Sequence, residues 1–204
     1  INKLIREAYD RMKEDVKVAH ILVSCAPGTD TMAAWKKIDS IYRVIDSKKS
    51  DFESMAKECS DDKGSKDRGG ELGYFTSLQY IYAFENAAYS TPVGKISKPF
   101  KTQFGYHIVK VLDRHPDRGT VKVAQIMIQT SKAKGEEGVI AVRKRADSVV
   151  AMLKNGASFS ELVMKYSDDQ YSVKDSGVLK PFGAGRMVME FENAAFALKK
   201  PGDI

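Results

Sequence analysis

Two histidines are the side chains of this sequence best placed for chemistry, because each stands on a strand-like segment. His20 lies on an apolar face of the alternating residues 16–24, and His107 on an apolar face of residues 106–112. One inward-facing histidine is usually a core residue with a satisfied hydrogen bond. Two of them on the first and last strands of one unit favour a His–His pair. His115 stands in a linker, and we interpret it as solvated.

The sequence lacks the residue patterns of metal-binding, phosphate-binding and hydrolase sites. The clustered carboxylates Asp61, Asp62, Asp67 and Glu71 do not fit the spacing of a calcium loop, and no His or Cys pairs stand at zinc spacing. The glycines from Gly69 to Gly73 are not followed by the Lys-Ser/Thr of a phosphate-binding loop. The nucleophile elbow of a Ser-His-Asp hydrolase is also missing. We therefore predict no metal and no cofactor.

The elements that must position the histidines occur twice in the sequence. Three short blocks recur in the same order, 105 to 107 residues later: residues 16–19 at 121–124, 60–62 at 167–169, and 84–88 at 191–195. A period near 100 residues indicates two copies of a whole domain. Differences between the copies therefore serve as an internal comparison.

The order of elements within each copy predicts an α+β fold. A strand, then helices, then further strands indicates a small antiparallel sheet flanked by short helices. The second copy should begin with a strand over 121–129. It lacks a counterpart of residues 97–113, so we expect a truncated domain in a fragment of a longer protein. The predicted organisation is a helical segment 1–15, a first domain 16–113, a linker 114–120 and a second domain 121–204.

Composition excludes some partners. The chain has 204 residues, of which 43% are hydrophobic and 29% charged, as in ordinary globular domains. Its net charge is +6, but the basic residues are scattered and not interleaved with aromatics, so we predict no nucleic-acid partner. Apolar runs stay well short of the roughly 20 residues that span a bilayer, which predicts no stable membrane insertion. No signal peptide is present in this sequence, and its oligomeric state stays open.

Several blocks of the first copy resemble one family, the parvulin-type peptidyl-prolyl isomerases. The matching blocks are Val18-Ala-His20, Ser60-Asp-Asp62, Gly69-Gly-Glu-Leu-Gly73, Phe84-Glu-Asn-Ala-Ala88 and Thr102-Gln-Phe-Gly-Tyr-His107-Ile108. The last block is highly specific. The resemblance covers residues 16–113 completely and 121–204 as a truncated second copy.

The resemblance implies a site that twists a prolyl amide. That bond must cross a barrier of about 18–20 kcal/mol without being broken, so an apolar slot and a dry polar wall suffice. By resemblance, the polar wall consists of His20, Asp62, Thr102 and His107. The substrate-binding slot consists of Leu72, Phe75, Tyr80, Phe84 and Phe104.

The two copies differ within these positions. Tyr80 stands where the family commonly has Met, and Gln125 stands in the second copy in place of the first histidine. The remaining counterparts in the second copy are Asp169, Leu179, Phe182, Met187 and Phe191. If the His–His pair determines catalysis, the Gln125 difference favours the first copy as the catalyst. If the shape of the slot determines it, the second copy is favoured.

Two functions are compatible with these features. The first is an isomerase, or foldase, acting on Xaa-Pro bonds of unfolded or exported polypeptides. The alternative is a non-catalytic chaperone whose clefts hold unfolded client segments. Tandem copies behind a helical segment resemble the SurA-type exported foldases, which implies the periplasm or cell envelope of a bacterium.

Overall fold

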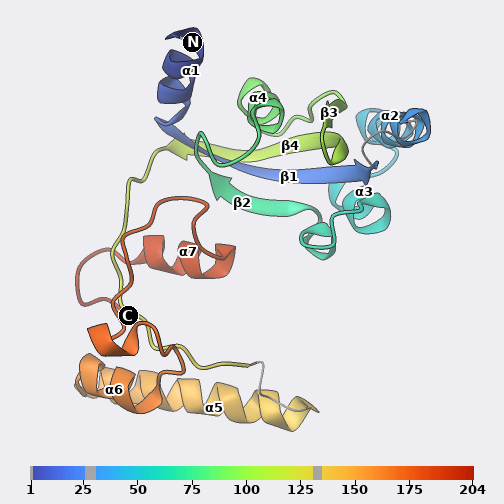
Figure 1. Ribbon diagram of the computed structural model, residues 1–204. Coiled ribbons are helices and arrows are strands. Elements are labelled where there is room, and N and C mark those ends of the chain that lie inside the picture. The colour runs from blue at the N-terminus through green and yellow to red at the C-terminus, as the bar shows by residue number, and fades with distance from the viewer. Residues whose placement is uncertain (1, 26–30, 131–134) are drawn as a thin grey trace. The chain divides into compact units, whose positions relative to one another are not determined.

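The computed structural model describes residues 2–25, 31–130 and 135–204 of the chain (Figure 1). These residues form two compact units: Ile1–Gly119 together with Gly183–Ile204, and Thr120–Phe182. Residues 183–204, which the repeat assigns to the second copy, thus group with the first unit. The predicted domain boundaries at 113 and 121 remain predictions from the repeat.

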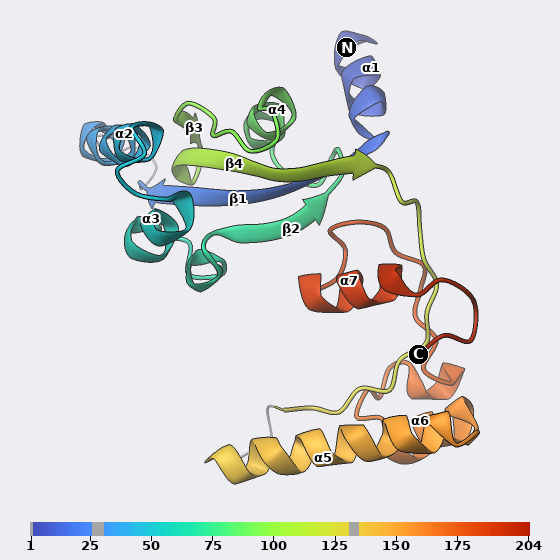
Figure 2. The same cartoon turned by 180° about the vertical axis from the view of Figure 1, so that it is seen from behind.

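A four-stranded antiparallel sheet is the centre of the first unit. Its strands run in the order β2-β1-β4-β3, an order that can be followed from both sides (Figures 1 and 2). The bounds are β1 Glu14–Ser24, β2 Glu71–Phe75, β3 Phe100–Thr102 and β4 Gly105–Pro116. Because β1 lies between β2 and β4, it is buried over most of its length. The predicted antiparallel α+β architecture is confirmed for this unit.

The register of β1 and β4 brings the two histidines to one face. His20 is opposite Val109, and His107 is opposite Leu22, so the two side chains are diagonal neighbours. Their face packs against α4 (Tyr82–Ser90), whereas Ile21 and Ile108 on the other face pack against α2 (Met32–Asp46) and α3 (Phe52–Cys59). The predicted adjacency of the strands and contact of the histidines are both confirmed.

Further helices surround this sheet. Helix α1 (Asn2–Arg11) precedes β1, the short 3₁₀ helix η1 (Lys66–Arg68) precedes β2, and α7 (Met189–Ala197) belongs to the first unit through its contact with β2. Within the described ranges, no helix combines the length and the apolar character needed to cross a bilayer.

The second unit contains α5 (Gly135–Lys154), α6 (Phe159–Tyr166) and η2 (Val173–Asp175). The strand predicted over 121–129 is wrong as a continuous strand, since this segment forms only the isolated bridges of Val121 with Phe182 and Ala124 with Val178. The physical reason is that a continuous strand needs a partner strand along its whole length. In the first unit β4 pairs with β1 from end to end, whereas the described part of the second unit has no such partner for 121–129.

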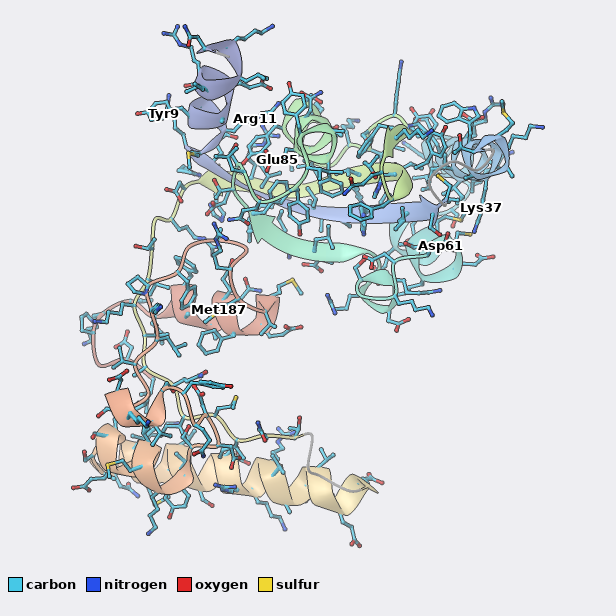
Figure 3. The ribbon with its side chains drawn as sticks, viewed as in Figure 1. Tyr9, Arg11, Lys37, Asp61, Glu85 and Met187 are labelled. Atoms are coloured by element: carbon cyan, nitrogen blue, oxygen red, sulfur yellow. The ribbon has the colours of Figure 1, made fainter. Side chains whose placement is uncertain are left out.

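Two repeated glutamates hold the loops that precede α4 and α7. The carboxylate of Glu85, labelled in Figure 3, accepts the backbone N–H groups of Gln79 (2.9 Å) and Tyr80 (3.0 Å). Its counterpart Glu192 accepts the N–H of Gly185 at 2.8 Å. Both glutamates are 3% exposed. The repeated Phe-Glu-Asn-Ala-Ala block therefore fixes a loop as well as a helix.

We expect Glu85→Ala to destabilise the first unit by about 1–3 kcal/mol, because two loop N–H groups then lose their acceptor. Glu85→Gln should lose less, since an amide oxygen can still accept. Urea unfolding of the full chain measures both variants against the wild type. Equal stability of Glu85→Ala and wild type would contradict this role.

Candidate active site

A continuous chain of hydrogen bonds joins four side chains from separate parts of the first unit. Asp62 Oδ2 lies 2.7 Å from His20 Nε2, His20 Nδ1 lies 3.4 Å from His107 Nδ1, and His107 Nε2 lies 2.8 Å from Thr102 Oγ1. These are the four residues predicted for the polar wall. Strands β1 and β4 supply the histidines, β3 supplies the threonine, and the loop after α3 supplies the aspartate.

The chain has one direction of donation that fits all its members. If Asp62 is ionised and His20 is neutral, His20 Nε2–H donates to Asp62, which leaves His20 Nδ1 as an acceptor. His107 Nδ1–H then donates to His20, and the hydroxyl of Thr102 donates to His107 Nε2. The Thr102 oxygen in turn accepts the backbone N–H of Phe104 at 3.0 Å. All four ring nitrogens are thereby engaged within the wall, so none is left over to act as a general base.

Burial and hydrogen bonding set the charges of this wall. Burial opposes ionisation of Asp62, but hydrogen bonds from His20, Ser65 and the Gly64 N–H outweigh it and hold the pKa of Asp62 below its usual value. Burial, aided by repulsion from His20, lowers the pKa of His107 to about 4. His107 is only 4% exposed. The wall therefore combines an ionised carboxylate with a neutral imidazole at pH 7.

The Ser-Asp-Asp motif explains how Asp62 reaches His20. Ser60 Oγ accepts the N–H of Leu22 at 3.2 Å, and Asp61 Oδ2 accepts the N–H of Ser24 at 2.8 Å, so both residues anchor the loop to β1. Asp61 stands at the end of β1 next to Lys37 (Figure 3), with which it forms an ion pair of 3.8 Å. With its first two residues tied to the strand, the motif directs Asp62 back along β1 to His20.

The second unit repeats this anchoring. Ser167 Oγ accepts the N–H of Met127 at 3.2 Å, and Asp168 Oδ2 accepts the N–H of Gln129 at 2.9 Å. Asp169 Oδ2 then accepts Gln125 Nε2 at 2.7 Å and also the hydroxyl of Ser172. The structure thus brings the predicted pair Gln125 and Asp169 together as it does His20 and Asp62.

One glycine in each copy completes the anchoring. The carbonyl of Gly70 accepts the N–H of His20 at 2.9 Å, and the carbonyl of Gly177 accepts the N–H of Gln125 at 2.8 Å. Both glycines have positive φ, +82° and +78°, and a Cβ on either would lie 2.2–2.3 Å from a backbone oxygen of the opposite residue. Only glycine allows so close an approach.

An aromatic cluster adjoins the polar wall, with Phe84 at its centre. The Phe84 ring packs edge-on against His20 (5.7 Å between centroids) and His107 (5.9 Å). It also stacks with Tyr80 at 5.0 Å and lies 6.3 Å from Phe75. The predicted slot residues Phe75, Tyr80 and Phe84 are therefore in mutual contact, and the slot shares a boundary with the wall.

The other predicted slot residues lie differently. Leu72 packs against the same buried cluster. Phe104 is 56% exposed, and its contact with the wall is through its backbone N–H. In the second copy, Leu179 and Phe182 belong to the second unit, whereas Met187 and Phe191 belong to the first.

Two residues of the site were not predicted. Ser65 donates to Asp62, and Phe100 stacks on His107 with centroids 5.4 Å apart. Both carry a sequence signal. Ser65 follows Asp62 by three residues, as Ser172 follows Asp169, and Phe100 precedes Thr102 by two, which places both on one face of a strand. Among the residues whose positions are described, no cluster of three or more His, Cys, Asp or Glu could hold a metal.

Comparison with known proteins assigns the family. The model of the PPIC-type peptidyl-prolyl isomerase domain matches residues 2–115 and again residues 112–204. The chain therefore belongs to this parvulin family, with two family domains in tandem, and the predicted family is confirmed.

Within that family, relatives similar to the chain include bacterial foldases. The chain is 42% identical to foldase protein PrsA 1 of Bacillus cereus over 108 residues (53% of this chain, 34% of the relative). It is 43% identical to foldase protein PrsA of Exiguobacterium sibiricum over 114 residues (55% and 34%). The chain thus spans about a third of the length of these relatives. Among solved structures, PrsA of Bacillus anthracis matches with a TM-score of 0.45 and 31% identity, covering 69% of this chain and 55% of the other.

The lowered pKa of His107 predicts a pH dependence of stability. An unfolded histidine protonates near pH 6.5, whereas the folded one resists protonation down to about pH 4. The free energy of unfolding should therefore fall as the pH drops from 6.5 towards 4, by up to about 3 kcal/mol. His107→Gln should lack this contribution. Urea unfolding of both proteins at pH 7 and pH 4.5 measures the difference, and an identical loss in the two would contradict it.

Proposed function

We propose that the first copy catalyses cis–trans isomerisation of Xaa-Pro bonds in unfolded or partly folded polypeptides. The observation that carries this proposal is the contact between the fully engaged His20–His107 pair and the Phe84 ring. A reaction that breaks no bond needs no nucleophile, metal or free base. It needs an apolar surface for the proline ring beside a fixed polar wall, and the site consists of these two parts.

The physical basis is the change in polarity as the amide twists. A planar amide is stabilised by resonance, which also gives it a large dipole, and the twisted bond has lost both. An environment without water therefore favours the twisted state relative to the planar one. The neutral His107 and the packed rings around Phe84 provide such an environment. The one ionised member, Asp62, lies behind His20 and fixes its orientation.

For the second copy we propose a binding role. Gln125 keeps the hydrogen bond to Asp169, but an amide has no second ring nitrogen through which the chain of the wall could continue. A copy with this wall could hold an extended client segment without lowering the barrier. Together the copies would form a foldase with one catalytic and one binding domain.

We further propose that the clients are exported polypeptides and that the protein acts in the periplasm or cell envelope of a bacterium. The bacterial foldases among its relatives support this location. The supply of Xaa-Pro segments by such clients follows from the proposed reaction.

The chain itself offers a matched variant for the catalytic proposal. His20→Gln gives the first copy the residue that the second copy has, and the amide can still donate to Asp62 as Gln125 does to Asp169. We expect kcat/KM for a blocked Xaa-Pro peptide to fall about tenfold or more, equivalent to about 1.4 kcal/mol in the transition state. Peptide affinity should change little. Exchange NMR on the full chain measures rate and binding without a coupling protease.

Phe84 tests the slot separately. Phe84→Ala should remove the contact with the proline ring and, at about 3 kcal/mol for such a pocket, lower kcat/KM by roughly 100-fold. Because Phe84 is also a core residue, Phe84→Leu is measured beside it, with thermal unfolding as the check on folding. Wild-type turnover at the uncatalysed rate, with client affinity lost in Phe84→Leu, would decide for a chaperone without catalysis.

A further inference from the structure

The ring expected to receive the substrate's proline is covered in the free protein. Phe84 is 3% exposed, although the proposed function requires a proline ring to pack against it. Among the residues that the structure describes, rings in contact with it include His20, Phe75, Tyr80, Phe100 and His107. Of these, Tyr80 is the most exposed, at 38%. It is therefore the ring through which the slot can open to solvent.

Tyr80 covers Phe84 by a nearly parallel stack. The two ring centroids are 5.0 Å apart with 29° between the planes, and the same Tyr80 ring meets Phe75 edge-on at 4.8 Å. Tyr80 thus contacts the slot through its ring, whereas 38% of the residue remains exposed. Its burial, with the nearby charge of Asp62, raises the pKa of the Tyr80 phenol.

The backbone at Tyr80 is held by hydrogen bonds, so the slot must open by movement of the Tyr80 side chain. The N–H groups of Gln79 and Tyr80 both donate to the buried carboxylate of Glu85. The side chain of Gln79 also donates to the carbonyl of Ala184 at 2.7 Å. Moving the loop would break these bonds, whereas rotating the tyrosine about χ1 breaks only ring contacts.

We propose that Tyr80 is a gate of the proline slot, which stacks on Phe84 in the free protein and rotates away when a proline ring enters. This inference rests on the proposed isomerase site and adds the residue that sets its affinity. The incoming proline must replace the contact between two aromatic rings, so the gate weakens binding of every Xaa-Pro segment. The second copy has Met187 at this position, a flexible side chain without a ring.

Two variants distinguish the effect of the Tyr80 ring from that of its hydroxyl. Tyr80→Met removes the stack and should lower Kd and KM for a blocked Ala-Ala-Pro-Ala peptide about 2- to 10-fold, the strength of an aromatic pair. The value of kcat should change less than KM. Tyr80→Phe keeps the ring and should stay within about twofold of wild type. Tyr82→Met, the same exchange at an exposed tyrosine of α4, is the matched control and should bind like wild type.

The position of the ring is measured directly on the full chain. Proton NMR should show a Tyr80–Phe84 ring contact in the free protein that disappears when the Ala-Ala-Pro-Ala peptide binds. Persistence of that contact in the complex, or a Tyr80→Met variant that binds no better than wild type, would overturn the gate.

The two proposals fail in different ways. A ring that leaves Phe84 in a complex without accelerated isomerisation supports the gate and overturns the isomerase. Accelerated isomerisation with the ring still in place supports the isomerase and overturns the gate. If neither the wild-type protein nor the Tyr80→Met variant binds the peptide, both proposals are overturned.

Discussion

The hydrogen bond between Asp62 and His20 is the constraint on which the rest of the site depends. It fixes which nitrogen of His20 carries the proton, and that choice passes through His107 to Thr102. A wall ordered in this way would need no reorganisation during the proposed reaction, which is how fixed dipoles contribute most to catalysis. The hydrogen bond that anchors Ser60 to β1 serves the same constraint, because it positions the Asp62 carboxylate next to the His20 imidazole.

The two copies share a frame and differ in what the frame presents. Backbone groups of the first strand segment are held by Ser60 in one copy and by Ser167 in the other, at the same distance of 3.2 Å. Because these bonds use backbone N–H groups, they do not depend on the side chain two residues earlier. The first copy can therefore have His20 where the second has Gln125, and both keep the anchored loop. A duplicated domain of this type can therefore change its chemistry one residue at a time while its fold is retained.

The proposed substrate slot is built from the hydrophobic core itself. Phe75 and Phe84 are at most 3% exposed and pack with valines of β1 and β4. Burial against this core lowers the pKa of His107. Burial also covers Phe84, which is why the partly exposed ring of Tyr80 becomes important for entry of a proline.

The sequence by itself determined the repeat, the strand faces of His20 and His107, and the family, because periodicity and short motifs are local properties of the chain. The helices of both copies were predictable for the same reason. The tertiary structure decided what depends on partners distant in sequence. Among the described residues it left 121–129 without a full-length partner strand, stacked Phe100 on His107, and placed Phe104 outside the ring cluster. It also stacked Tyr80 on Phe84. Pairing and packing of this kind arise only when separate segments meet, so no local pattern contains them.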